Sequence, residues 1–132
     1  MELKKIINAL HSAFERNDVK EAVLDDYWYK LNIKTGIHST GFCFAASEVI
    51  YRLNGKNNWK VFSLKDPEHW NNGTHYFLKK RQSKEILDIT RNQYEERNIE
   101  IPYNLGKGRG LRNISNKANT LAKMAGLGVL PK

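Results

Sequence analysis

Cysteine, proline and long apolar runs are scarce in this sequence, and each shortage excludes a class of protein. Cys43 is the only cysteine among 132 residues, so no disulfide can form within the chain. No apolar stretch approaches the roughly 20 residues that span a bilayer, and residues 1–10 are typical of an amphipathic helix, not of a signal peptide. We therefore expect a single domain over residues 1–132 in the cytoplasm of a bacterium or a phage-infected cell.

Acidic residues are also in deficit. The chain has 14 Asp and Glu against 22 Lys and Arg, a net charge of +8 that favours an anionic partner or serves solubility. Basic residues become denser in residues 106–112, where Lys107, Arg109 and Arg112 are interspersed with glycine. A flexible solvated loop beside the active site is the simpler interpretation, and a loop that holds a phosphate or an anionic substrate is the alternative. The Gly-Lys-Ser/Thr ending of a P-loop is missing.

Cys43 lies where a small-residue turn leads into a predicted helix. Ser39 or Thr40 would be the N-cap, and Gly55 would end the helix after Asn54. In the first helical turn, unpaired backbone N–H groups and the positive end of the helix dipole favour a thiolate and can hold a developing oxyanion. A cysteine among aromatic residues can equally be part of the core.

Residues 74–90 are typical of two short strands around a polar turn. A two-residue loop at 81–82 and a four-residue loop at 80–83 give the same register, in which Leu78 faces Glu85 and His75 faces Asp88. Directly opposed side chains lie on one face of a sheet, with Cβ atoms about 5 Å apart. An imidazole paired with a carboxylate is the orienting half of a catalytic triad, so this pair shifts the balance for Cys43 toward catalysis.

The order of these residues resembles that of the papain-like and transglutaminase-like cysteine enzymes. It is more similar still to small uncharacterised bacterial and phage proteins with the motifs G-x-C-x-x-x-S-E, H-[WY]-F-L and D-x-T-x-x-Q, which correspond here to residues 41–48, 75–78 and 88–93. The resemblance implies that Cys43 is the nucleophile, His75 the base and Asp88 the residue that orients it. Papain-like proteases carry a Gln shortly before the cysteine for the oxyanion hole, whereas this chain has Ile-His-Ser-Thr, which leaves the donor open.

Four other side chains are weaker candidates for the site. His69 competes with His75 as the base, and His38 could donate to the oxyanion or be an ordinary loop histidine. Trp70 and Tyr76 could line the substrate cleft or belong to the core. Metal-ligand spacings such as H-x-x-x-H and C-x-x-C are missing, so we expect neither a metal nor a cofactor.

The periodicity predicts an α+β fold in which helices pack on a small antiparallel sheet. Helices are expected from residue 3 to 14, from 18 to 27, around Cys43, after a Thr90–Gln93 capping box and from 115 to 125. Residues 59–64 alternate as a strand, and residues 32–40 are expected to form a loop.

The sequence thus predicts a thiol-dependent hydrolase or acyl transferase with a Cys43-His75-Asp88 triad. An amide, an isopeptide, a thioester and an amidine all remain open as its substrate. The alternative is a non-enzymatic basic module that binds nucleic acid or an acidic host protein through Lys107, Arg109 and Arg112.

Overall fold

The computed structural model describes residues 1–65 and 73–132, and it has the α+β architecture expected from the sequence. The helices in the described residues are α1 (Leu3–Phe14), α2 (Asn17–Val23), α3 (Asp26–Thr35), α4 (Cys43–Asn54), α5 (Asn92–Glu95) and α6 (Asn116–Met124), with a 3-10 turn η1 at Tyr103–Leu105. The strands are β1 (Trp59–Lys65), β2 (Thr74–Lys80), β3 (Ile86–Leu87) and β4 (Lys107–Arg109). None of the helices in the described residues is long and apolar enough to cross a membrane.

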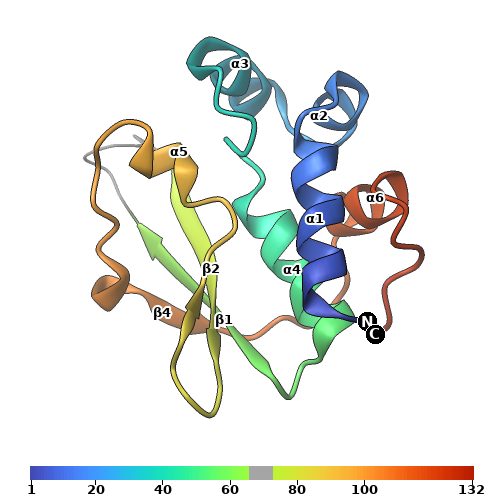
Figure 1. Cartoon of the computed structure of the whole chain (residues 1–132), viewed down its shortest axis with the longest axis vertical. Helices are drawn as coiled ribbons and strands as arrows, with labels where there is room; N and C mark the ends of the chain where they lie inside the picture. Colours follow the sequence, from blue (N-terminus) through green and yellow to red (C-terminus); the bar gives the residue numbers. More distant parts are fainter. Residues whose placement is uncertain (66–72) are drawn as a thin grey trace.

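The four strands form one antiparallel sheet in the order β3-β2-β1-β4. Helix α4 packs on one face of the sheet, with α1 and α6 against it, and the segment from α5 to η1 lies at the other side (Figure 1). The larger core fills the space between the sheet and the helices, and a smaller cluster of Leu64, Phe77, Tyr94 and Ile101 lies under the α5 segment. Both chain ends lie beside the end of α4 (Figure 1).

The helical periodicity seen in the sequence corresponds to the buried faces of these helices. Ile6, Leu10 and Phe14 of α1 are buried in the larger core, as their i, i+4 spacing predicts. Helix α6 begins where Ser115 accepts a hydrogen bond from the backbone N–H of Ala118, as an N-cap should. The predicted start of the helix around Cys43 is wrong. Helix α4 begins at Cys43 itself, and its N-cap is neither Ser39 nor Thr40.

The region after α2 contains a helix that the sequence pattern does not predict. The pattern indicates one helix from residue 18 to 27 and a loop from 32 to 40, but α2 ends at Val23 and a second helix, α3, extends into the predicted loop as far as Thr35. Asp25 causes the break, because its carboxylate accepts a hydrogen bond from Trp28 N and so caps a new helix. Gly36 ends α3 with a left-handed φ of 69°.

The β2–β3 hairpin has a register different from the predicted one. Leu78 pairs with Leu87 and Lys79 with Ile86, which is a shift of two residues along β3. The loop consists of residues 81–84, and Lys84 adopts a left-handed φ of 63°. Since side chains alternate with period two, a shift of two keeps each on its original face, and Asp88 remains a diagonal neighbour of His75.

The basic segment at residues 106–112 also differs from its prediction as a flexible loop. Its central residues form β4, which pairs with β1 at the edge of the sheet through Val61–Arg109 and Ser63–Lys107. The sequence Lys-Gly-Arg is short and has no apolar residue, so it lacks the alternating pattern of a strand. Only its pairing with β1 identifies β4.

Candidate active site

Cys43 is the first residue of α4 and is almost buried, with 9% of its surface exposed. Gly41, two residues earlier, has a φ of +90°, and a Cβ there would lie 2.9 Å from Trp28 Cβ, so the turn before Cys43 requires glycine. The Cys43 sulfur lies 3.6 Å from the carbonyl oxygen of Thr74, to which the thiol donates. The first N–H groups of a helix have no partner within it, so backbone donors are available in the first turn of α4, where Cys43 lies.

His75 and Asp88 form a buried pair. The imidazole Nε2 lies 2.6 Å from Asp88 Oδ2, and the two residues are 2% and 9% exposed. A carboxylate can only accept hydrogen bonds, so Nε2 carries the proton that binds Asp88. The remaining ring nitrogen, Nδ1, is therefore the one available to Cys43. Tyr94 packs edge-on against the imidazole at 4.9 Å between ring centroids and helps to fix its plane.

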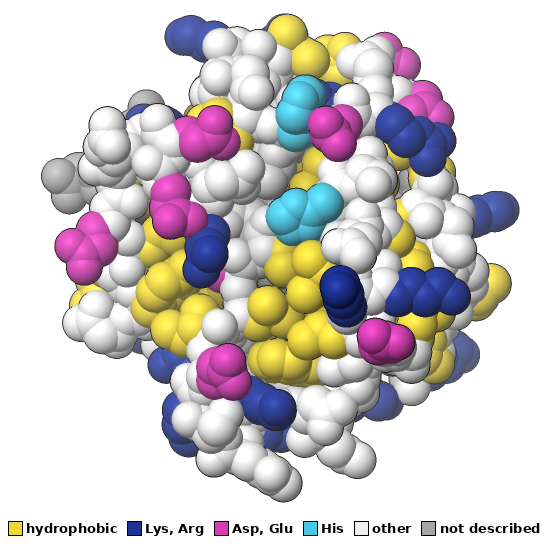
Figure 2. All heavy atoms as spheres, in the orientation of Figure 1, with side chains coloured by type: hydrophobic (Ala, Val, Ile, Leu, Met, Phe, Trp, Pro, Cys, Tyr) yellow, Lys and Arg dark blue, Asp and Glu magenta, His cyan; other side chains and the backbone are white. Residues whose placement is uncertain are grey.

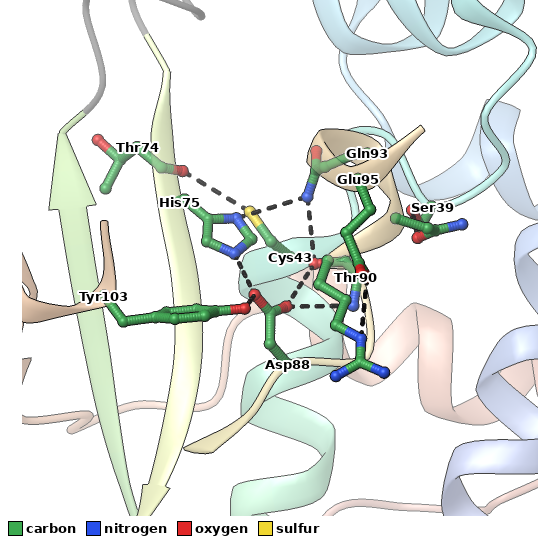
Figure 3. Close-up of polar contacts among 11 residues, drawn as sticks. Ser39, Cys43, Thr74, His75, Asp88, Thr90, Gln93, Glu95 and Tyr103 are labelled. Carbon is green, nitrogen blue, oxygen red and sulfur yellow. Dashed lines mark hydrogen bonds and ion pairs between the residues drawn. The ribbon is translucent and has the colours of Figure 1, made fainter. Parts of the chain in front are cut away.

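Asp88 is held by three further hydrogen bonds. Its Oδ1 accepts from the backbone N–H of Thr90 at 3.2 Å and from the Thr90 hydroxyl at 3.3 Å. Its Oδ2 accepts from the hydroxyl of Tyr103 at 2.8 Å, in addition to His75 (Figure 3). Burial, the charge of Asp88 and this hydrogen bond all raise the pKa of Tyr103, so the phenol stays a donor. The carboxylate is thus fixed in one orientation.

The environment of His75 stabilises its protonated form. Burial alone would lower the pKa of the imidazole, but the hydrogen bonds to Asp88 and Cys43, together with the negative charges of these two groups, raise it to about 9. A histidine that stays protonated beside a thiol favours a thiolate–imidazolium pair. The electrostatics therefore couple the three residues that the sequence pattern indicates.

Gln93 is a fourth polar residue at this point, and the sequence pattern does not predict its place there. It is 2% exposed, and its amide nitrogen lies 3.5 Å from His75 Nδ1 and 3.1 Å from the Thr90 hydroxyl. Figure 3 shows this amide beside the imidazole nitrogen and the sulfur of Cys43. Its spacing from Thr90 predicts a capping box, but its side chain reaches the Thr90 hydroxyl and the site. The signal that could have found it is its position in the D-x-T-x-x-Q motif.

A pocket of about 220 Å³ opens beside Cys43. Its walls are mostly apolar and include Trp28, Phe44 and Tyr76, while Lys117 supplies one positive charge. Phe44 and Tyr76 meet edge to face at 4.9 Å. Burial and the charge of Cys43 raise the pKa of Tyr76, and the charge of Arg109 acts in the opposite direction.

Other predicted binding residues lie elsewhere or outside the described residues. His38 is exposed and its Nδ1 lies 2.8 Å from the Lys20 ammonium, so its contacts give no support for a role in the oxyanion hole. Lys107 is exposed on β4, and Arg109 on the same strand donates to Ser63 Oγ at 2.6 Å. His69 and Trp70 lie outside the described residues.

Two larger hollows lie behind the site and do not include Cys43. One, of about 540 Å³, is lined by α5 and Tyr103, and the other, of about 480 Å³, reaches Asp88 between α1 and α5. Figure 2 shows the surface hollowed between these helices, with apolar side chains along the hollow. Because the thiol opens into the smaller pocket, we take that pocket as the reactive side. Among the described residues, no three His, Cys, Asp or Glu side chains gather as a metal site.

No protein family model, curated protein or solved structure matches the chain.

Proposed function

We propose that the protein is a thiol-dependent hydrolase or acyl transferase, papain-like or transglutaminase-like in its mechanism and in the placing of its nucleophile. One observation carries the proposal. His75 is buried between Asp88, 2.6 Å from Nε2, and the thiol of Cys43 at a helix N-terminus, and its pKa is raised to about 9 by these two partners against the effect of burial. A purely structural cysteine needs neither a histidine nor a carboxylate.

Before substrate binds, the Cys43 thiol has given its proton to His75 Nδ1, and Asp88 stabilises the resulting imidazolium through Nε2. The thiolate attacks a carbonyl carbon, forming a C–S bond while the carbonyl electron pair moves to oxygen. In this proposal the backbone N–H of Cys43, at the start of α4, and the amide of Gln93, beside the imidazole, would donate to this oxyanion. When the carbon–leaving-group bond breaks, the imidazolium returns the proton to the leaving group.

The second step determines whether the acyl group is hydrolysed or transferred to an amine. Water or an amine gives its proton to His75 and attacks the acyl thioester, which releases the Cys43 thiolate. The pocket beside Cys43 has aromatic walls, and its size suits an acyl group about as large as one large side chain. A single reduced thiol in this role fits the cytoplasm.

Covalent labelling tests the proposal directly. Iodoacetamide should alkylate Cys43 near pH 6.5, well below the pKa of about 8.5 of an unperturbed cysteine, and His75→Ala should slow this reaction at least about ten-fold. A thioester or p-nitrophenyl ester should then leave an acyl group on Cys43, read by intact mass spectrometry. The matched control is His11→Ala, on the exposed side of α1.

The proposal fails if Cys43 reacts only at the pH of an ordinary thiol and His75→Ala changes nothing. It also fails if alkylation is fast but no activated acyl donor modifies Cys43, because a reactive Cys43 thiol would then not act in acyl chemistry.

A further inference from the structure

Part of the sheet face opposite α4 is left uncovered. Near Leu64 and Phe77 that face is covered by Tyr94, Ile101 and Tyr103, but toward the β2–β3 loop it opens into a groove of about 290 Å³. The groove is lined by Phe62 and five basic side chains, Lys60, Lys79, Lys80, Arg81 and Lys84.

The arrangement of these lysines is costly for the fold. Lys60 and Lys79 are direct cross-strand partners on β1 and β2, and like charges placed opposite each other destabilise a sheet. In residues 1–65 and 73–132, none of the four groove lysines forms an ion pair with an acidic side chain. Acidic side chains of the described residues therefore do not offset this repulsion, whereas an anionic ligand would remove it.

The groove is also held in place before any ligand binds. The backbone N–H of Arg81 donates to Asn58 O, and its side-chain Nε donates to Lys56 O, both at 2.9 Å. Lys84 N donates to Lys80 O, which closes the hairpin loop. These bonds tie the loop to the beginning of β1, so little ordering of the backbone is needed on binding.

Phe62 places an aromatic ring in the middle of the basic side chains. The ring is half-buried, stacks on Phe77 at 5.8 Å between centroids, and has the Lys79 ammonium 4.6 Å from its centre. A positive groove with an aromatic ring is the combination that binds single strands, because the phosphates contact the cations and a base can stack. We propose that this groove, defined by Phe62 and the five basic residues, binds single-stranded nucleic acid.

The groove is separate from the thiol site and from the basic side chains of residues 106–112. Gly108 pairs with Phe62, whereas Lys107 pairs with Ser63, so Lys107 and Arg109 project from the other face of the sheet. Lys60 extends over Gly108, since a Cβ there would lie 2.9 Å from Lys60 Cε. The proposed nucleic-acid site therefore consists of residues of its own and does not depend on the chemistry of Cys43.

Fluorescence anisotropy with labelled oligo-dT and oligo-U of about 12 nucleotides tests this site in the full chain. We expect binding to both strands that weakens with salt between about 50 and 300 mM. The double variant K60A/K79A should flatten the slope of log K against log salt by about 1.4 units, at about 0.7 for each phosphate that the variant no longer neutralises. Phe62→Leu should weaken binding at least about five-fold with little change in slope.

The matched control is K4A/K5A, which removes two exposed lysines from α1 and makes the same change in net charge. Equal weakening in K4A/K5A would overturn the proposal in favour of general charge attraction. Absence of oligonucleotide binding, or binding of poly-glutamate with equal affinity, would also overturn it, the latter in favour of an acidic protein partner. Cys43→Ala should bind like the wild type, which separates this result from the proposed acyl chemistry.

Discussion

Tyr103 and His75 donate to the same oxygen of Asp88. The phenol of Tyr103 lies 2.8 Å from Asp88 Oδ2, and His75 Nε2 lies 2.6 Å from it. Each donor draws on the same negative charge, so the hydrogen bond from Tyr103 reduces the charge that Asp88 presents to the imidazole. Tyr103 is therefore placed to moderate how strongly Asp88 raises the pKa of His75.

Tyr103→Phe should raise the pKa of His75 above about 9, by up to about one unit, because Asp88 would then direct its charge to the imidazole alone. Asp88→Asn should lower that pKa, because the stabilising charge is removed. NMR titration of the His75 ring signals measures both changes. Tyr27→Phe, at a half-exposed phenol on α3, is the control. An unchanged pKa in Tyr103→Phe would show that the hydrogen bond from Tyr103 does not moderate the charge of Asp88, and a fall would contradict the prediction.

The raised pKa of His75 also makes stability depend on pH. The imidazole has a folded pKa of about 9 against about 6.5 when unfolded, so the folded state binds its proton more tightly. This stabilisation is fully present below pH 6.5 and is lost as the pH rises through 9, and its size is on the order of 3 kcal/mol. Urea unfolding at pH 6 and pH 9.5 should show the loss in the wild type and not in His75→Gln. The same loss in His75→Gln would assign it to other groups.

The three residues of the proposed triad could be selected from the sequence because each depends on local signals. Cys43 follows a glycine turn at a helix start, and His75 and Asp88 lie on the two arms of one hairpin. The predicted register is wrong by two residues, because Arg81 and Gln82 lack the turn chemistry that fixes a two-residue loop, and Lys84 takes the left-handed position instead. The pair survives this error because a shift of two preserves the face.

The residues that complete the site depend on packing between distant segments. Tyr103 reaches Asp88 from the turn η1, in a segment with no pattern that predicts its position. The spacing of Gln93 from Thr90 fits a helix cap, and only the approach of α5 to β2 shows its proximity to His75. Strand β4 could not be predicted from the sequence for the same reason, because it is a strand only through its pairing with β1.

Glu48→Gln should destabilise the fold without changing the labelling of Cys43. Glu48 lies 2.7 Å from Arg52 Nε, both side chains are 1% exposed, and Glu48 also accepts from the Ser115 hydroxyl at the start of α6. Loss of its charge leaves the buried guanidinium uncompensated, which costs about 3 to 5 kcal/mol. Urea unfolding measures the change, with the exposed Glu21→Gln as control. A cost under about 1 kcal/mol would show that the pair contributes little to stability.

The basic residues in and just after β4 are predicted to be dispensable for the reactivity of the Cys43 thiol. Replacing Lys107, Arg109 and Arg112 with Ala should leave the rate of Cys43 alkylation within about two-fold, because these residues take no part in proton transfer. The affinity for an acyl donor can change, since the charge of Arg109 acts on Tyr76 at the pocket. Alkylation and acylation of the triple variant are compared with those of K4A/K5A. A large drop in the alkylation rate would show that Arg109 helps to hold the thiolate.

Gln93→Ala separates the two duties that Gln93 could perform. If its amide holds the oxyanion, acylation of Cys43 by a thioester should fall about 10²-fold while iodoacetamide alkylation, which forms no oxyanion, stays near the wild-type rate. Asn92→Ala, at the preceding position of α5, should leave both rates close to normal, although Asn92 bonds the Ser39 hydroxyl. Equal decreases in acylation and alkylation would instead mean that Gln93 acts through His75, as a residue that positions the imidazole for the thiol.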